Sequence, residues 1–302
     1  DWLSVGGGLD YIRSSVHLNQ RADLAGLPTS SPGVTFGMLG IPKGTDVFNA
    51  DLTGNSWSGT GHFGVLITTE RVNIGIRYLM RGTADIQGDA TFEQLPTNIL
   101  LPAGSPLQPT APSRCVGIVP NDTLSARAGL PLDDVLTCNA TLQTTFGDQH
   151  ASVPIRLPDQ LIIGTSIQAN DKLRLLFDMQ FTNWSVFQAL ALTFQQSAIS
   201  RTLYEDYNNT IGLRFGAEYQ FSPAFTVRGG GLMHQAAAPA QTVTPLLPEA
   251  ERSEATLGAS IRVGRNGQLD FAYQKIWQAD RRGRVVEPPV RGPSGAAVNT
   301  GL

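Results

Sequence analysis

The sequence predicts an all-β fold, a transmembrane β-barrel whose antiparallel strands run up and down. Apolar and polar side chains alternate in stretch after stretch, as they do where one strand face meets lipid and the other lines a lumen. Short turns alternate with long connections, and charged residues make up only 16% of the chain, against about 25% in soluble proteins. Residues 211–221 show the alternation, with one face formed by Ile211, Leu213, Phe215, Ala217, Tyr219 and Phe221, and the other by Gly212, Arg214, Gly216, Glu218 and Gln220.

Nine strands follow from this alternation, and we expect them at residues 3–17, 56–69, 72–91, 153–169, 172–195, 209–221, 225–237, 253–264 and 268–280. Short turns lie near Arg71, Asp171, Pro223 and Gly267, and Asn266-Gly267 is a strong hairpin signal. Barrels of bacterial outer membranes place their long connections outside the cell. We therefore expect one partial barrel domain over 1–302, with extracellular loops at about 18–55, 92–152, 196–208, 238–252 and 281–302.

Several motifs along the chain carry a resemblance to a known family. They read RLPDQLIIG from Arg156, NDKL from Asn170, FTNWSVF from Phe181 and TPLLP from Thr244, together with LTGNSW before residue 58. With them the chain resembles the FadL family of outer-membrane transporters, which carry long-chain fatty acids and other hydrophobic compounds. The resemblance covers most of the chain.

The resemblance implies a fourteen-stranded barrel with an N-terminal hatch, of which the nine strands here match the fifth to the thirteenth. A piece that lacks the hatch, the first four strands and the last strand cannot close, so we expect an open, curved sheet. The resemblance also implies location in the outer membrane of a Gram-negative bacterium and no enzymatic activity. The implied function is passive uptake of fatty acids or of aromatic or aliphatic hydrocarbons, by capture on extracellular loops and passage through the barrel.

Other functions remain open alternatives from the residues alone. A general porin would have a water-filled pore without a hatch. A lipid-modifying enzyme of the outer membrane would need a catalytic constellation, for which His62 and His234 with nearby serines are the candidates. A soluble all-β binding protein would show the same alternation of side chains.

Apolar residues in the first two long loops are the candidates for ligand capture, because exposed apolar patches often mark binding surfaces. In the family the equivalent loops form the outer capture site. The alternative is that these side chains only pack the loops together. The candidates are Phe36, Met38, Leu39, Ile41 and Phe48 in the first loop, and Leu95, Ile99 and Leu100 in the second.

Charged side chains on the polar strand faces are predicted to line the lumen. They either form a paired ionic network, or one or two of the arginines hold a carboxylate, which a guanidinium binds well. The second interpretation favours fatty acids over neutral hydrocarbons. The predicted lumen residues are Arg77, Arg81, Arg174, Asp178, Arg214, Glu218, Arg228 and Arg262.

Cys115 and Cys138 fall in one long loop, and an even cysteine count outside the cytoplasm predicts a disulfide, with two free thiols as the alternative. The four histidines are scattered without metal-ligand spacing, so we expect neither a metal nor a cofactor. The net charge of −3 without basic runs argues against a nucleic-acid partner. The expected partners are a hydrophobic small molecule and outer-membrane lipid or lipopolysaccharide, and the expected state is a monomer.

Overall fold

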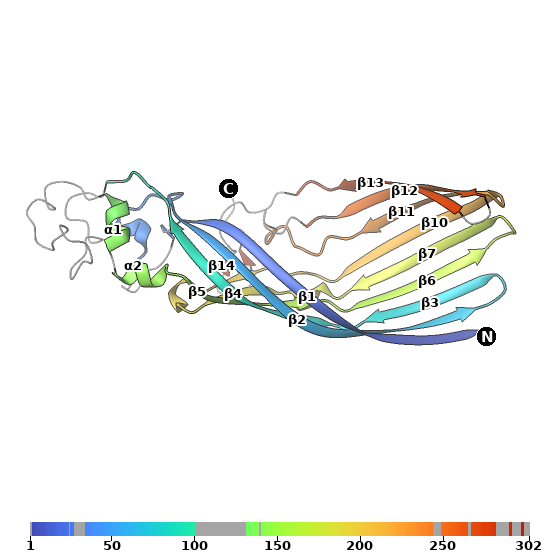
Figure 1. Cartoon of the computed structure of the whole chain (residues 1–302), viewed down its shortest axis with the longest axis horizontal. Helices are drawn as coiled ribbons and strands as arrows, with labels where there is room; N and C mark the ends of the chain where they lie inside the picture. Colours follow the sequence, from blue (N-terminus) through green and yellow to red (C-terminus); the bar gives the residue numbers. More distant parts are fainter. Residues whose placement is uncertain are drawn as a thin grey trace, which may run out of the picture.

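The computed structural model of the chain describes residues 2–23, 25–26, 34–100, 131–138, 140–243, 249–264, 267–281, 290–291 and 297–298. One antiparallel sheet of 13 strands dominates these residues and does not close on itself, which confirms the predicted open sheet. Figure 1 shows the short turns at one end of the sheet, with the N-terminus, and the helices α1 (Leu132–Cys138) and α2 (Ala140–Thr145) at the other. We call these the inner end and the outer end.

In the half of the sheet next to the inner end, nine strands lie side by side in chain order. Each is hydrogen-bonded to the next, and β1 and β13 are the two edges. The nine are β1 (Leu3–Asp23), β2 (Asp46–Thr68), β3 (Val72–Leu79), β6 (Gln160–Gln168), β7 (Leu173–Thr182), β10 (Thr210–Ser222), β11 (Phe225–His234), β12 (Arg252–Val263) and β13 (Gly267–Gln278).

The inner turns are tight and use the residues that tight turns prefer. Between β6 and β7, Asn170 Oδ1 accepts hydrogen bonds from the backbone N–H groups of Lys172 and Leu173, both at 3.0 Å. Such a side chain replaces a backbone acceptor in a turn. Between β12 and β13 the chain turns through Gly264, whose φ of 67° suits glycine.

The half of the sheet next to the outer end is built differently, because only β1 and β2 run through both halves. Beyond β2 the outer half continues with β4 (Gly82–Gln94), β5 (Gln149–Leu157), β8 (Ala189–Phe194) and β9 (Arg201–Tyr204). A small separate sheet pairs β14 (Val290–Arg291) with β15 (Ala297–Val298).

Three of the predicted strands are interrupted, which corrects the sequence prediction. The stretch 72–91 divides into β3 and β4 at Met80 and Arg81, and 153–169 divides into β5 and β6 at Pro158 and Asp159. The stretch 172–195 divides into β7 and β8 around a 3-10 helix, Trp184–Val186. Pro158 has no backbone N–H to give to a neighbouring strand, which explains one of these breaks.

Three of the predicted long connections contain regular structure that the sequence did not predict. β1 continues to Asp23 and β2 begins at Asp46, so both strands extend into the predicted loop 18–55. The region 92–152 contains α1, α2 and the start of β5, and 196–208 contains a 3-10 helix, Ser197–Ile199, and β9. Among the described residues, no helix has the length and apolar character that crossing a membrane requires.

Candidate functional site

The strands of the inner half have an apolar face and a polar face, as the alternation predicted. We call the first the outward face and the second the inward face. Large outward side chains are exposed in the sheet, for example Leu9 at 94% and Leu257 at 66%. Exposed apolar residues in a row of strands are expected where the surrounding medium is lipid.

Glu218 is the centre of a charged row on the inward face. Arg228 Nε donates a hydrogen bond to Glu218 Oε2 at 2.6 Å, and Arg174 Nη1 lies 3.7 Å from Glu218 Oε1. On its other side Arg228 donates to Ser260, and Ser260 donates to Asp270. The row therefore joins β7, β10, β11, β12 and β13 through side chains and balances two of the predicted arginines.

The other predicted lumen residues of the inner half are less tightly paired. Arg214 donates to the neutral amide of Gln180 at 2.5 Å, and the carboxylate of Asp178 lies over the backbone of β6. Arg77 and Arg262 also occupy inward positions. No carboxylate among the described residues lies within ion-pair distance of either arginine.

The polarity of β1 reverses along its length. On its outward face Leu9 and Tyr11 give way to Arg13 and His17, whereas on its inward face Asp10 gives way to side chains such as Val16. The pairing of β1 with β2 runs without a register shift over this region, so a bulge does not cause the reversal. The apolar outward belt therefore ends just beyond Tyr11.

β2 reverses at the same level. Its outward face changes from Phe63 and Trp57 to Thr53 and Asp51, and its inward face changes from polar to apolar residues such as Leu52. The rings of Tyr11 and Trp57 stack there with centroids 4.7 Å apart. Aromatic rings favour the boundary between lipid and water. We infer that the outer edge of the membrane lies at this pair.

Beyond the boundary, the outer half has an apolar interior and a polar exterior. On β4 and β5 the side chains of Thr83, Asp85 and Arg156 are exposed, while those on the other face are buried. The buried side chains form the inner apolar cluster, which consists of Ala84, Ile86, Val153, Phe187, Leu190, Leu192, Tyr207, Ala237, Ala238 and Val243. Val16 and Leu52 pack against this cluster.

A second group of buried side chains, the cap cluster, joins the first loop to the helices at the outer end. It consists of Ala25, Phe36, Ile41, Val47, Phe48, Leu132, Leu136 and Phe146. Three predicted capture residues, Phe36, Ile41 and Phe48, are therefore buried and hold the loops together. Ile99 packs against the cluster, and Leu95 is half-buried.

Two predicted capture residues are available at the surface. Met38 is 72% exposed and Leu100 is 69% exposed. The side chain of Leu39 lies outside the described residues, so its exposure stays untested.

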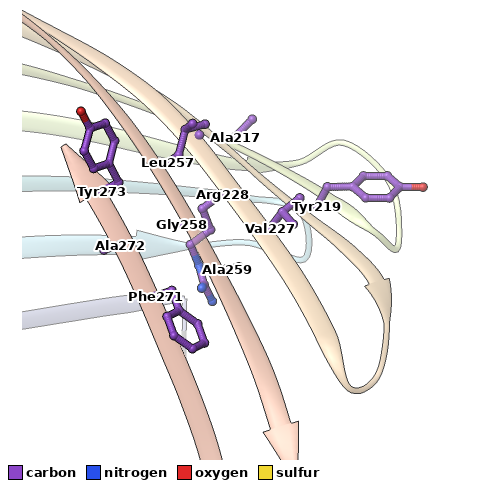
Figure 2. A pocket seen from close by; sticks show the side chains of 11 residues that line it. Ala217, Tyr219, Val227, Arg228, Leu257, Gly258, Ala259, Phe271, Ala272 and Tyr273 are labelled. Carbon is purple, nitrogen blue, oxygen red and sulfur yellow. The ribbon is translucent and has the colours of Figure 1, made fainter. Parts of the chain in front are cut away.

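A hollow of about 590 Å³ lies on the outward face of β10–β13 rather than in the lumen. Figure 2 shows Tyr273, Leu257 and Phe271 around it, with Tyr219 and Val227 from the neighbouring strands. Its lining is almost wholly apolar. It is thus a feature of the lipid-facing surface.

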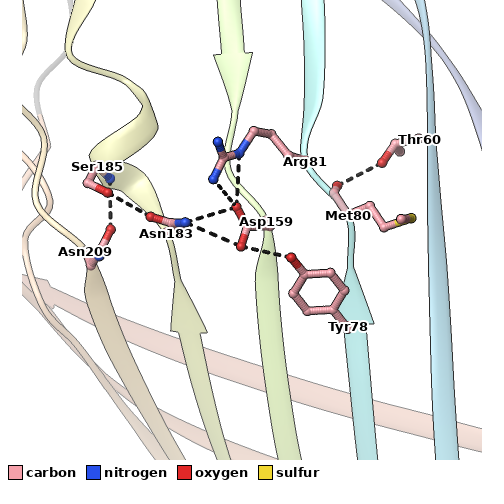
Figure 3. Close-up of polar contacts among 8 residues, drawn as sticks. All are labelled: Thr60, Tyr78, Met80, Arg81, Asp159, Asn183, Ser185 and Asn209. Carbon is pink, nitrogen blue, oxygen red and sulfur yellow. Dashed lines mark hydrogen bonds and ion pairs between the residues drawn. The ribbon is translucent and has the colours of Figure 1, made fainter.

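Asp159 connects the three strand breaks at the level of the membrane boundary (Figure 3). Its carboxylate accepts hydrogen bonds from Arg81 Nη2 at 2.9 Å, from the Tyr78 hydroxyl at 3.1 Å and from Asn183 Nδ2 at 3.1 Å. Its backbone carbonyl accepts a further bond from the N–H of Asn183 at 3.0 Å. Ser185 extends the network by donating to Asn183 Oδ1. Arg81, predicted in the lumen, is therefore held at the break.

Glu205 is a buried carboxyl group beyond the membrane boundary, between β9 and β10. It is 3% exposed, and burial together with the charge of Asp206 raises its pKa to about 7. Its backbone carbonyl accepts a 2.6 Å hydrogen bond from Thr242 Oγ1, which ties this segment to the connection after β11.

The structure does not bring the two candidate catalytic histidines together. His62 Nδ1 lies 2.7 Å from Asp10 Oδ2 on the inward face of β1 and β2, whereas His234 lies against Gly212 on β10. Four strands separate β2 from β11 in the sheet. Among the described residues, no group of three metal-ligating side chains gathers at one point. Cys115 and the side chain of Cys138 lie outside the described residues, so the predicted disulfide is untested.

Comparisons with known proteins agree with this architecture. A profile of the family described as "Outer membrane protein transport protein (OMPP1/FadL/TodX)" matches residues 1–287. Outer membrane protein P1 of Haemophilus influenzae is 28% identical over 125 residues, which are 41% of this chain and 27% of that protein. The chain thus matches about a quarter of the length of this curated relative.

Two solved structures share the fold. A Pseudomonas aeruginosa FadL homologue matches with a TM-score of 0.67 and 22% identity, over 92% of this chain and 57% of that one. The Pseudomonas putida toluene transporter TodX matches with a TM-score of 0.56 and 17% identity, over 89% of this chain and 58% of that one. The chain therefore spans less than two thirds of either structure.

Proposed function

Because the chain belongs to the family of outer-membrane transport proteins that includes FadL and TodX, we propose that its protein takes up hydrophobic molecules across the bacterial outer membrane by a passive route. The family likeness extends over nearly the whole chain. The proposal for this protein depends on its own side chains, in particular those of the outer half.

The single observation that carries the proposal is the polarity reversal at the membrane boundary. Beyond it, apolar side chains such as Leu52 and Ile86 pack in the interior and polar side chains cover the exterior. A hydrophobic solute that enters gains roughly 25 cal/mol for each Å² of apolar surface it removes from water. A general porin serves hydrophilic solutes, which gain nothing from such a wall, so the reversal favours the uptake of hydrophobic molecules.

We place the first contact at the exposed apolar side chains of the outer end. Met38 and Leu100 are exposed on the two loops that the cap cluster joins. The inner apolar cluster follows towards the membrane, and the inward face with its charged row follows after that. This order gives a solute apolar steps down to the lumen without a chemical reaction.

The inward arginines bear on which hydrophobic molecules pass. Arg174 and Arg228 share Glu218, and Arg228 also reaches Asp270 through Ser260, whereas Arg77 faces the lumen without a described carboxylate partner. A guanidinium in that position suits the carboxylate of a fatty acid. We therefore propose fatty acids as substrates together with hydrocarbons, with Arg77 as the residue that distinguishes them.

The capture step is tested by removing the exposed apolar side chains without touching the cap cluster. The full-length gene carrying Met38→Ser and Leu100→Ser is expressed in a strain that lacks it, and the initial uptake of labelled oleate and toluene is measured below saturation. Losing two apolar contacts is expected to lower uptake about tenfold. Lys43→Ser, an exposed change in the same first loop, is the matched control.

Unchanged uptake in the double variant, with equal amounts of protein in the membrane, would refute capture at these residues. Equal loss in the Lys43 control would show that the loop change itself is responsible. Growth of the deletion strain on oleate and on toluene separates the substrate classes. Arg77→Gln is expected to lower oleate uptake and to leave toluene uptake unchanged.

A further inference from the structure

We propose that the outward face of β10–β13 binds a phosphate-bearing glycolipid of the outer leaflet, with an acyl chain in the hollow and a phosphate group on Lys275. This surface lies on the opposite side of the wall from the inward face. The inference therefore does not depend on which molecule the protein transports.

The hollow exists because small outward residues lie among larger ones. Ala217 pairs with Gly229, and Ala259 lies between Val227 and Phe271 in the strand register. Larger side chains rise around these small ones, notably Leu257 at 66% and Tyr273 at 65% exposure (Figure 2). The volume of about 590 Å³ falls within the usual range for small-molecule sites, roughly 300–1,000 Å³. An apolar recess of this kind fits an acyl chain.

Lys275 is the next outward residue after Tyr273 on β13. In the described part of β10–β13 it is the only charged side chain on the outward face. It is exposed, and no described carboxylate lies within ion-pair distance of it. A lysine on the lipid face is strongly unfavourable at the midplane of the membrane and nearly neutral at its interface. Its position beside Trp277 therefore indicates the headgroup level, where phosphate is the complementary anion.

The order of these features matches a lipid of the outer leaflet. Lys275 lies towards the outer end of β13, and the hollow lies on the membrane side of it. An outer-leaflet lipid places its headgroup and its acyl chains in that same order, whereas an inner-leaflet lipid has the reverse order. β1 repeats the arrangement, because Arg13 follows Tyr11 on the outward face and lies 5.5 Å from the ring centroid of Trp57.

The test uses the full-length protein in detergent, with bound lipid counted by native mass spectrometry. The probes are bisphosphorylated lipid A, dephosphorylated lipid A and phosphatidylglycerol. We expect lipid A to bind about tenfold more tightly than its dephosphorylated form, which corresponds to about 1.4 kcal/mol. Lys275→Gln should remove this preference and Lys275→Arg should keep it. Lys172→Gln, in an inner turn, is the matched control and should change nothing.

The hollow is tested separately by Ala259→Phe, which is expected to weaken the binding of both forms of lipid A. Val65→Phe, on the outward face of β2, is the matched control. If the migration of Ala259→Phe on a gel shows that this variant does not fold, Ala259→Leu is used in its place. Equal binding of both lipid A forms, or a preference that survives Lys275→Gln, would overturn the phosphate assignment. Phosphatidylglycerol bound as tightly as lipid A would overturn the assignment of a glycolipid as the ligand. Unchanged binding in the Ala259 variants would overturn the placement of an acyl chain in the hollow.

Discussion

Removing the carboxylate of Asp159 should destabilise the protein more than any other single change in the network at the strand breaks. Asp159→Ala leaves the Tyr78 hydroxyl and the Asn183 amide without their acceptor, and it leaves Arg81 without its counter-ion. A hydrogen bond to a charged group contributes about 1.5–3 kcal/mol. The side chain of Arg81 is half-exposed and regains water, so its loss counts for less. We expect a total cost of about 4 kcal/mol.

The assay is urea-induced unfolding from phospholipid vesicles, followed by tryptophan fluorescence. Trp184 lies next to Asn183 and reports on the break directly. Asp89→Ala is the matched control, because Asp89 pairs with His150 while both side chains are exposed. Exposed pairs contribute little, and the control should change the free energy of unfolding by less than about 0.5 kcal/mol.

The expected ranking is part of this prediction. Asp159→Ala should cost most, because it affects three donors at once, and Arg81→Ala should cost about 1 kcal/mol. A cost for Asp159→Ala no greater than that of Asp89→Ala would refute the reasoning. So would an Arg81→Ala variant that is less stable than Asp159→Ala.

Three further predictions follow from other positions. Glu205→Gln removes a carboxyl group whose pKa is raised from 4.5 to about 7. The contribution of Glu205 to stability is therefore fully present below pH 4.5 and lost as the pH rises through 7. The free energy of unfolding of the variant should depend less on pH between 5 and 8 than that of the unchanged protein. At pH 8 the variant should be more stable than the unchanged protein by about 3 kcal/mol. Gly88→Ala would place a Cβ 1.8 Å from a backbone carbonyl of β2 and should cost more than about 3 kcal/mol in urea titrations, whereas Gly59→Ala, which has open space, should cost almost nothing. Phe215→Arg, on the lipid face, should lower the free energy of unfolding from vesicles by about 2–4 kcal/mol, while Thr83→Arg, outside the membrane, should leave it unchanged.

The inner half of the sheet could be predicted from the sequence because its information is local. The alternation in β10 and the turn residues between β6 and β7 each act on their own strand or hairpin. The confirmed open sheet follows from these signals together with the family resemblance. The periodicity of apolar residues describes single strands, however, and it does not indicate which residues far apart along the chain contact each other. Asp159 meets Arg81, which is 78 residues away along the chain, and no local pattern contains that contact.

The polarity reversal is present in the sequence but its meaning is not. Val16 and Leu18 alternate with His17 and Asn19 with the same period of two as the residues of the membrane half. Alternation says that two faces differ, and it does not say which face meets water. Only the burial of Val16 against the inner apolar cluster shows that the apolar face points inwards there. Residues around 12–20 and 46–54 could have given a signal, since charges replace apolar residues on one face.

β1 and β2 keep one uninterrupted ladder from the pair of Leu3 and Ile67 to the pair of Ala22 and Phe48. At about 3.3 Å per residue this ribbon is roughly 65 Å long. The three neighbouring predicted strands are interrupted near its middle, between β3 and β4, between β5 and β6, and between β7 and β8. We therefore expect a tilt of the cap cluster to reach the inner end along this ribbon, and to be absorbed by bending at the breaks elsewhere in the sheet.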